Sequence, residues 1–198
     1  MPQLLRRVLV PACLLLASCS GSELIGFHLD LTQKGGAKLT TRALVDSPKP
    51  GPAEVAAHGV KWERSAALVH SQGTVANLAN LDFGDQSLRI VPRLEGEGPT
   101  LRIHLQRGPA AGWVQSLALP LDQRAPLTKV YDPTGKTTVF ADVLRLEIEN
   151  LTDVVGSSVL PTARGVEAGR DGKRAWLVIP VATALEPGPE LVWDVSWR

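Results

Sequence analysis

The chain has 198 residues, of which 21 are lysine or arginine and 20 are aspartate or glutamate, so its net charge is close to zero. A near-neutral chain lacks the basic surface on which nucleic-acid binding depends, and we therefore expect no nucleic-acid partner. The length suffices for one domain with a sizeable core. Two cysteines, Cys13 and Cys19, are too few for a disulfide framework.

The first residues have the pattern of a secretory leader. Arg6 and Arg7 precede the apolar run Val8–Ala17, which ends in small residues. This run is about ten residues long, whereas a helix that crosses a bilayer needs about 20. We therefore expect residues 1–18 to be a signal peptide and not a permanent transmembrane helix.

The segment that ends at Cys19 resembles the lipobox of bacterial lipoprotein precursors. Leu16, Ala17 and Ser18 match its first three positions, and Cys19 matches its invariant cysteine. The resemblance covers residues 1–19 only. It implies that the Cys19 thiol carries a diacylglyceryl group, that the mature chain begins there, and that acyl chains such as palmitate hold it on a membrane. The alternative is an ordinary secretory leader with a chance cysteine.

Residues 19–23 would link the lipid to the domain. Ser20, Gly21 and Ser22 span about 10–15 Å when fully extended, so the domain should lie close to its membrane. In the Gram-negative sorting pattern, an aspartate after the lipidated cysteine retains a lipoprotein in the inner membrane. Ser20 stands in that place, which favours the outer membrane, on its periplasmic face.

Residues 24–198 are expected to form a single β-rich globular domain. Cys13 leaves with the leader and Cys19 is lipidated, so this domain would have neither a disulfide nor a cysteine metal site. Apolar and polar residues alternate along most of it, which is the pattern of half-buried strands. Strands are predicted at Ile25–Leu31, Lys38–Val45, Val60–Arg64, Ser87–Leu94, Thr100–Gln106, Trp113–Leu121, Thr137–Asp142, Leu144–Ile148, Arg174–Val181 and Leu191–Trp197.

Turn sequences separate these strands, as at Gln33–Gly36, Gly96–Pro99 and Asp171-Gly172. Strands at short intervals joined by tight turns predict a mainly β fold, an antiparallel β-sandwich of short strands.

Three stretches fit this pattern less well. One short helix is expected near residues 53–58, and Ala182–Pro189 is expected to be a loop. Gly73–Leu81 has neither the period of a strand nor that of a helix. An α+β N-terminal half, followed by a sandwich from about residue 86, is therefore the alternative fold.

Candidate catalytic residues are few. His28 and Asp30 share one face of the first strand, about 7 Å apart, and would form a hydrolytic or metal site only if another strand contributed. His104 would likewise need acidic residues from elsewhere. The solvated outer face of a sheet explains all three, because polar residues occupy that face routinely.

Motifs for cofactors are incomplete. Thr134–Thr137 looks like the end of a phosphate-binding loop, but Val130 stands where such a loop requires glycine. Asp82 and Asp85 lack the dense oxygen ligands of a calcium loop and are expected to be loop residues. We expect no nucleotide, no metal and no other cofactor.

The five tryptophans offer a candidate ligand contact. Trp193 and Trp197 share the apolar face of one strand, and Trp62 shares a face with Val60, so these three are expected to pack in the core. Trp113 follows a Gly- and Pro-rich stretch at the start of a predicted strand. It is therefore the candidate for an exposed aromatic ligand contact.

These observations together predict a membrane-anchored envelope lipoprotein that acts as a non-catalytic structural or protein-interaction component. Its partners would be a membrane, through Cys19, and an envelope protein. The alternative is a binding module for a glycan or small ligand that uses Trp113. A hydrolase with an unrecognised site ranks third, because no complete catalytic motif is present.

Overall fold

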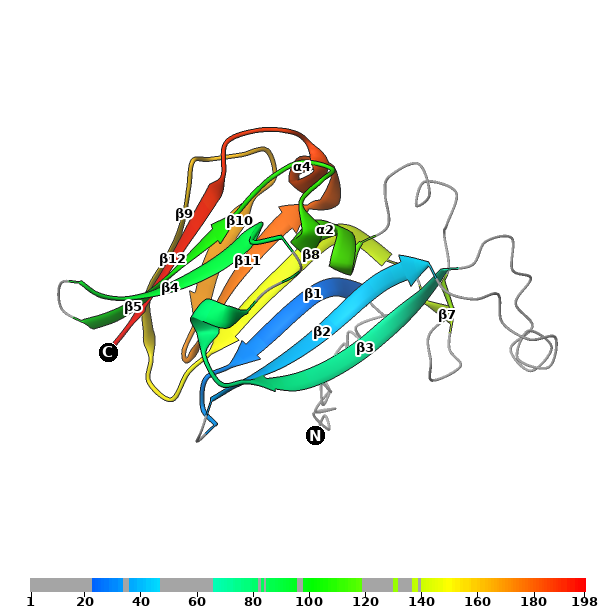
Figure 1. The fold of residues 1–198 in the computed structure, drawn as a ribbon. Helices are drawn as coiled ribbons and strands as arrows, with labels where there is room; N and C mark the ends of the chain where they lie inside the picture. Colours follow the sequence, from blue (N-terminus) through cyan, green and yellow to red (C-terminus); the bar gives the residue numbers. More distant parts are fainter. Residues whose placement is uncertain are drawn as a thin grey trace, which may run out of the picture.

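The computed structural model describes residues 23–33, 36–46, 66–81, 83, 85–95, 98–118, 130–131, 137–138 and 140–198. These residues form a mainly β fold of two sheets, whose strands are mostly antiparallel and do not close into a barrel (Figure 1). The predicted fold class is thereby confirmed.

The larger sheet, called sheet A, has eight strands in the order β10-β11-β8-β1-β2-β3-β6-β7. β1 lies near its middle, where it pairs antiparallel with β2 and parallel with β8. A second parallel contact joins β3 and β6. The strands are β1 (Glu23–Asp30), β2 (Ala37–Asp46), β3 (Ala66–Val75), β6 (Val130–Tyr131), β7 (Thr137–Thr138), β8 (Phe140–Glu149), β10 (Glu167–Asp171) and β11 (Arg174–Pro180).

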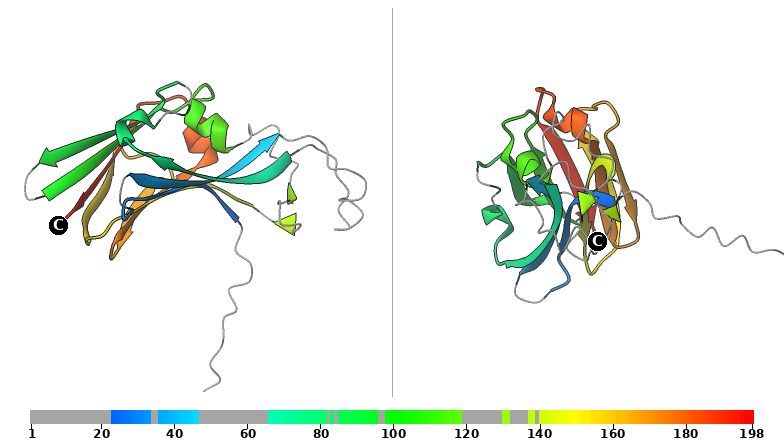
Figure 2. Two further views of the ribbon diagram at one scale, coloured as in Figure 1. Left: turned by 60° about the horizontal axis from the view of Figure 1, so that its bottom comes forward. Right: turned by 90° about the vertical axis from the view of Figure 1, so that its right-hand side faces the viewer.

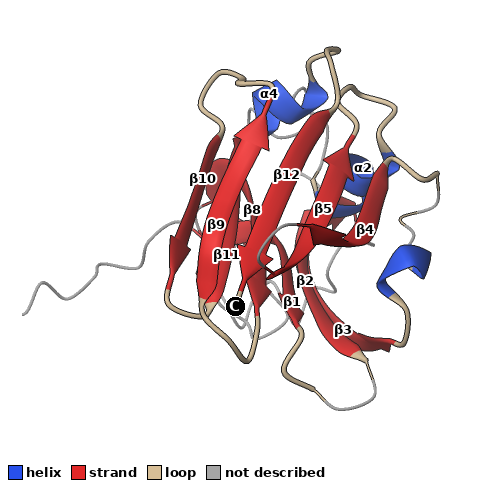
Figure 3. Ribbon diagram, turned by 90° about the vertical axis from the view of Figure 1, so that its left-hand side faces the viewer, coloured by secondary structure: helices blue, strands red, loops and turns tan. Residues whose placement is uncertain are grey.

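The smaller sheet, called sheet B, has four antiparallel strands in the order β4-β5-β12-β9. Figure 3 shows this sheet in front of sheet A, and the left view of Figure 2 shows the two sheets as separate layers. Its strands are β4 (Leu88–Glu95), β5 (Gly98–Leu105), β9 (Val154–Leu160) and β12 (Leu191–Trp197).

The core lies between the two sheets and follows the alternation in the sequence. In β1, β8, β5 and β12 the inward-facing residues are buried, and the residues between them are mostly partly exposed; Gly26 is an exception, because it is buried as well. Trp193 is fully buried in this core and Trp197 packs against it, as predicted. The alternating pattern of a half-buried strand therefore fixes which face of each sheet is turned inward.

Two short α-helices among the described residues correct the predictions: α2 (Gly112–Leu117) replaces part of a predicted strand, and α4 (Val181–Leu185) replaces part of a predicted loop. The strand predicted at Trp113–Leu121 is wrong, because its first part is α2. Trp113, Val114 and Leu117 are buried together, and their spacing of one and four residues places them on one face of a helix. α4 likewise occupies the start of the loop predicted at Ala182–Pro189.

The remaining predictions concern the N-terminal half. Gly73–Leu81 contains the end of β3 and a 3₁₀ turn, η1 (Leu78–Asn80). The helix near residues 53–58 and the strand at Val60–Arg64 lie outside the described residues. Because β1, β2 and β3 belong to the same sheet as β8 and β11, the described N-terminal strands are part of the sandwich and not of a separate α+β layer.

The two ends of sheet A differ in which strands begin and end there. At the end called proximal, β1 begins at Glu23 beside Phe140, where β8 begins, and β11 ends at Pro180 beside Val143. At the opposite end, called distal, β1 ends at Asp30 and the turn around Gly172 joins β10 to β11. The antiparallel pairing of β1 with β2 and of β10 with β11 agrees with the turns predicted at Gln33–Gly36 and Asp171-Gly172.

Candidate functional site

The predicted lipidation site precedes the described fold. Cys19 and its lipobox residues, Leu16, Ala17 and Ser18, lie outside the described residues. The first described residue is Glu23, the first residue of β1. In the part of the chain that the structure describes, no helix is both long and apolar enough to cross a membrane.

Trp113 is not an exposed aromatic, and its prediction as a ligand contact is wrong. Its side chain has no solvent-accessible surface, and its indole Nε1–H donates to the carbonyl oxygen of Gln106 at 2.8 Å. Its backbone N–H donates to the Ser87 hydroxyl at 3.0 Å. The helix turns the indole into the core, where its polar atom finds a backbone partner.

Asp85 supports the same helix. Its carboxylate accepts hydrogen bonds from the backbone N–H of Ser87 at 2.9 Å and of Gly112 at 2.7 Å. Ala111, at the N-cap of α2, provides no side-chain cap, so Asp85 supplies one from a different segment. The hydrogen bonds from Ser87, first from its side chain and then from its backbone, lower the pKa of Asp85 below its usual value, and the Gly112 N–H adds to this.

His28 and Asp30 do share the outer face of β1, as predicted. Asp30 faces the turn that follows, where its carboxylate accepts bonds from the Thr32 backbone at 2.8 Å and the Gln33 side chain at 2.8 Å. The hydroxyl of Thr32, then its backbone N–H and Gln33, lower the pKa of Asp30. Asp30 is therefore a turn residue, and it does not pair with His28.

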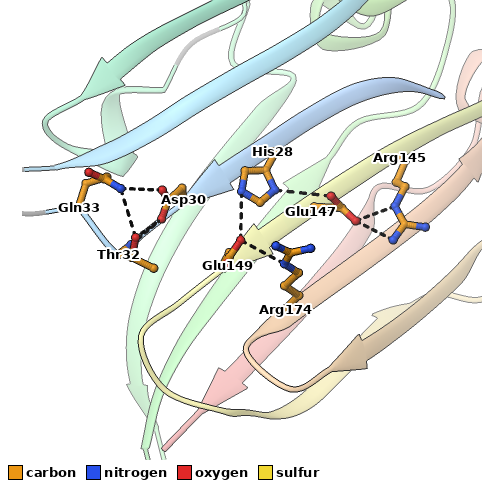
Figure 4. Close-up of polar contacts among 8 residues, drawn as sticks. All are labelled: His28, Asp30, Thr32, Gln33, Arg145, Glu147, Glu149 and Arg174. Atoms are coloured by element: carbon orange, nitrogen blue, oxygen red, sulfur yellow. Dashed lines mark hydrogen bonds and ion pairs between the residues drawn. The ribbon is translucent and has the colours of Figure 1, made fainter. Parts of the chain in front are cut away.

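β8 contributes the carboxylates that His28 meets. Because β8 runs parallel beside β1, Glu147 lies opposite His28 and Glu149 lies opposite Asp30. The imidazole is held between them, with Nδ1 3.5 Å from Glu147 Oε2 and Nε2 3.6 Å from Glu149 Oε2 (Figure 4). All three side chains are about 70 % buried, because each leaves between 26 % and 30 % of its surface exposed.

Two arginines extend this contact into a chain of charges across three strands. Arg145 places Nε 2.8 Å and Nη2 2.6 Å from Oε1 of Glu147, while Arg174 Nε lies 3.1 Å from Glu149 (Figure 4). Arg145 also stands over the Trp176 ring, 5.5 Å from its centre. Partly exposed pairs of this kind stabilise a fold by only about 0–1 kcal/mol each. The chain of charges therefore orders the surface more than it stabilises the fold.

The geometry around His28 is not that of a metal or hydrolytic centre. Each carboxylate faces a different ring nitrogen, so the three side chains do not converge on one point where an ion would sit. Within the described ranges, no group of three histidine, cysteine or acidic side chains could hold a metal ion. A catalytic base would also need a nucleophile within hydrogen-bond reach, and the two glutamates occupy both nitrogens instead.

His104, the other candidate, lies on the outer face of sheet B. Its Nδ1 is 2.9 Å from Glu190 Oε2, and Arg89 reaches the other oxygen of Glu190 at 3.3 Å. Beside it, Arg102 and Asp194 form a two-pronged ion pair with both distances at 2.7 Å. These contacts join β4, β5 and the start of β12. They are cross-strand pairs that support the register of sheet B.

A hollow of about 270 Å³ lies on the outer face of sheet A, next to His28. Its floor is the backbone around Gly26, and Arg42 and Arg145 flank this glycine on the neighbouring strands. Gly26 has a φ of +152°, and a Cβ at this position would overlap the carbonyl oxygen of Arg145. Only glycine fits here, because a side chain would collide with the backbone of β8. The lining consists of Ile25, Gly26, Phe27, His28, Thr40, Arg42, Arg145 and Glu147.

The residues that line the hollow were not predicted to meet. Alternation placed Arg145 and Glu147 on one face of their strand, and Gly26 and His28 on one face of another. No local signal indicates that these two strands, more than 100 residues apart, lie side by side. The contact between Trp176 and Gly169 of β10 was not predicted either. Trp176 is half-buried on the outer face, and its ring covers Gly169.

Comparison with protein-family models, with curated proteins and with solved structures finds no match for this chain.

Proposed function

We propose that the protein is an envelope lipoprotein, anchored through lipid on Cys19, whose sandwich is a non-catalytic component that binds another envelope protein. The observation that carries this proposal is the leader: Arg6 and Arg7, a short apolar run, and a four-residue lipobox that ends at Cys19. Two or three acyl chains, at about 0.8 kcal/mol for each buried CH₂, would hold the protein on a bilayer almost permanently.

The position of β1 supports a domain held close to the membrane. β1 begins at Glu23, so Ser20, Gly21 and Ser22 are the whole link to Cys19. Since these three residues reach about 10–15 Å, the proximal end of sheet A would face the bilayer. The distal end, with the turns after Asp30 and Asp171, would face away from it. Contacts with a partner are expected there or on the outer faces.

The His28 contacts favour a binding role over catalysis. Both ring nitrogens of His28 face carboxylates, and these carboxylates are held by Arg145 and Arg174. A side chain fixed on both sides by charged neighbours is suited to present a rigid polar surface. The Trp113 platform that would have supported a glycan-binding module is buried, so we do not propose that function.

The anchor is tested by replacing its cysteine. In the proposed lipoprotein, Cys19→Ala removes the acceptor of the lipid, so the protein should keep its leader or be released from membranes. Cell fractionation and intact mass measurement of wild type and variant detect this change. Cys13→Ala is the matched control, because this cysteine lies inside the leader and should leave both readouts unchanged. Equal mass and equal membrane association in wild type and Cys19→Ala would contradict the proposal.

A further inference from the structure

We propose that the hollow over Gly26 binds a phosphate group. The inference concerns the folded domain and does not depend on lipidation of Cys19. Two arginines flank Gly26 on the neighbouring strands. Arg42 on β2 and Arg145 on β8 are both register partners of Gly26, so their side chains rise from the same face of sheet A. Strands in a sheet are about 4.8 Å apart, which places the two arginine backbones about 10 Å from each other.

Two arginines at this separation can donate to one tetrahedral anion from opposite sides. A guanidinium carries five N–H donors in a planar fork that matches the oxygens of a phosphate. Each arginine can therefore keep its contacts within the fold and still donate to a ligand. In Arg145 the Nε and Nη2 atoms face Glu147, while Nη1 lies on the other side of the guanidinium group (Figure 4).

Arg145 is held in place before any ligand arrives. Glu147 holds the guanidinium group through two short contacts. The guanidinium carbon also lies over the Trp176 ring, 5.5 Å from its centre. Trp176 is itself laid across Gly169, where any larger residue would overlap the ring. Because the guanidinium group is ordered in advance, little side-chain entropy is lost when an anion binds.

The other residues that line the hollow indicate which chemical group could be esterified to the phosphate. Thr40 lies on the next cross-strand row and offers a hydroxyl, and its register partner His28 borders the hollow. Glu147 borders the same space and can accept a hydrogen bond from a ligand hydroxyl. A volume of about 270 Å³ accommodates a small group only. This set fits a phosphate esterified to a short polyol, either in a soluble ester or in a phospholipid headgroup such as phosphatidylglycerol.

Calorimetric titration of the full-length protein in dodecyl maltoside micelles with glycerol phosphate tests the site. Wild type should bind, and Arg42→Gln and Arg145→Gln should each weaken the affinity about tenfold or more, as expected for a lost charge-assisted bond. Arg174→Gln is the matched control: it removes the same charge from the same face, but Arg174 does not line the hollow. Its affinity should stay close to that of wild type.

Two further measurements complete the test. Thr40→Val removes one hydroxyl without changing charge, and should weaken binding even if an arginine variant misfolds. Micelles that contain phosphatidylglycerol show whether the bound phosphate belongs to a lipid or to a soluble ester. If the lipid competes with glycerol phosphate for the site, the ligand is a lipid headgroup; if it does not compete, the ligand is a soluble ester. No binding by wild type, or an equal loss in Arg174→Gln, would overturn the proposal. Neither result bears on the anchor, which membrane fractionation tests separately.

Discussion

Single residues in this fold take roles that their neighbours in sequence do not reveal. Asp85 is an exposed loop residue, as expected, and its carboxylate also caps α2 from a different segment. Gly26 was expected to be an ordinary outward-facing residue of β1. The backbone of β8 approaches it so closely that only glycine fits at this position. Both roles are set by tertiary contacts, and the sequence carries no local signal for either.

At the residue scale, Asp85→Asn tests the cap through its dependence on pH. Hydrogen bonds from Ser87 lower the pKa of Asp85 in the folded state below the ordinary value of 3.8. A carboxyl group whose pKa is lower in the folded state than in the unfolded state stabilises the fold. This stabilisation is fully present at pH values above the unfolded-state pKa, and it is lost as the pH falls through the folded-state pKa. Wild type should therefore be more resistant to urea than Asp85→Asn at pH 7, and the difference should shrink below about pH 4.

The exposed Asp153 provides the comparison for this measurement. Asp153→Asn should leave the urea midpoint of unfolding unchanged at both pH values. If Asp85→Asn behaves like Asp153→Asn at pH 7, the carboxylate does not stabilise the start of α2.

At the scale of elements, alternation in sequence predicted the strands that form the core and also β2, β4 and β11, but it missed β3, β9 and β10. β1, β5, β8 and β12 each bury every second residue, so their pattern is strong. β9 and β10 were missed, because most of their residues are partly or fully exposed and no period of two results. α2 was mistaken for a strand, although the spacing of Trp113, Val114 and Leu117 is helical.

Replacement of Trp113 tests the assignment of this element. The indole is completely buried in the helix, so Trp113→Ala should lower the free energy of unfolding by about 3–5 kcal/mol, through lost contacts and a cavity. Equilibrium urea unfolding measures this cost. Trp176→Ala is the comparison, because Trp176 is half-buried on the outer face of sheet A and should cost less. A Trp113→Ala variant no less stable than Trp176→Ala would place the indole at the surface instead.

At the scale of the whole molecule, the decisive contact is the parallel pair of β1 and β8. It joins residues more than 100 positions apart and places Arg145 and Glu147 beside Gly26 and His28. Composition and turn sequences indicated a sandwich, but antiparallel neighbours in sequence were the natural expectation. The sequence therefore sufficed for the fold class and for the polarity of each face. It did not suffice for the strand order, on which the hollow depends.

If the protein is anchored through Cys19 as proposed, its orientation on the membrane follows from where β1 begins. With a link of about 10–15 Å, the proximal end must stay nearer to the bilayer than the distal end. Ala182, exposed in α4, follows the proximal residue Pro180, whereas Leu151 is 62 % exposed in the connection that follows β8 at the distal end. Wild type would expose no free thiol once Cys13 is removed and Cys19 is lipidated, so an added cysteine can be labelled alone.

We expect a fluorophore on Ala182→Cys to be quenched more strongly than one on Leu151→Cys when the lipidated protein is inserted into vesicles with spin-labelled headgroups. The physical reason is distance: β8 has ten residues, and a strand rises about 3.3 Å per residue, so the two ends of sheet A are separated by about 30 Å. The same labelled proteins in micelles without spin label give the reference intensities. Equal quenching at both positions would mean that the sandwich lies flat on the bilayer, and stronger quenching at Leu151→Cys would show that the distal end faces the membrane. Either result would contradict the orientation inferred from the start of β1.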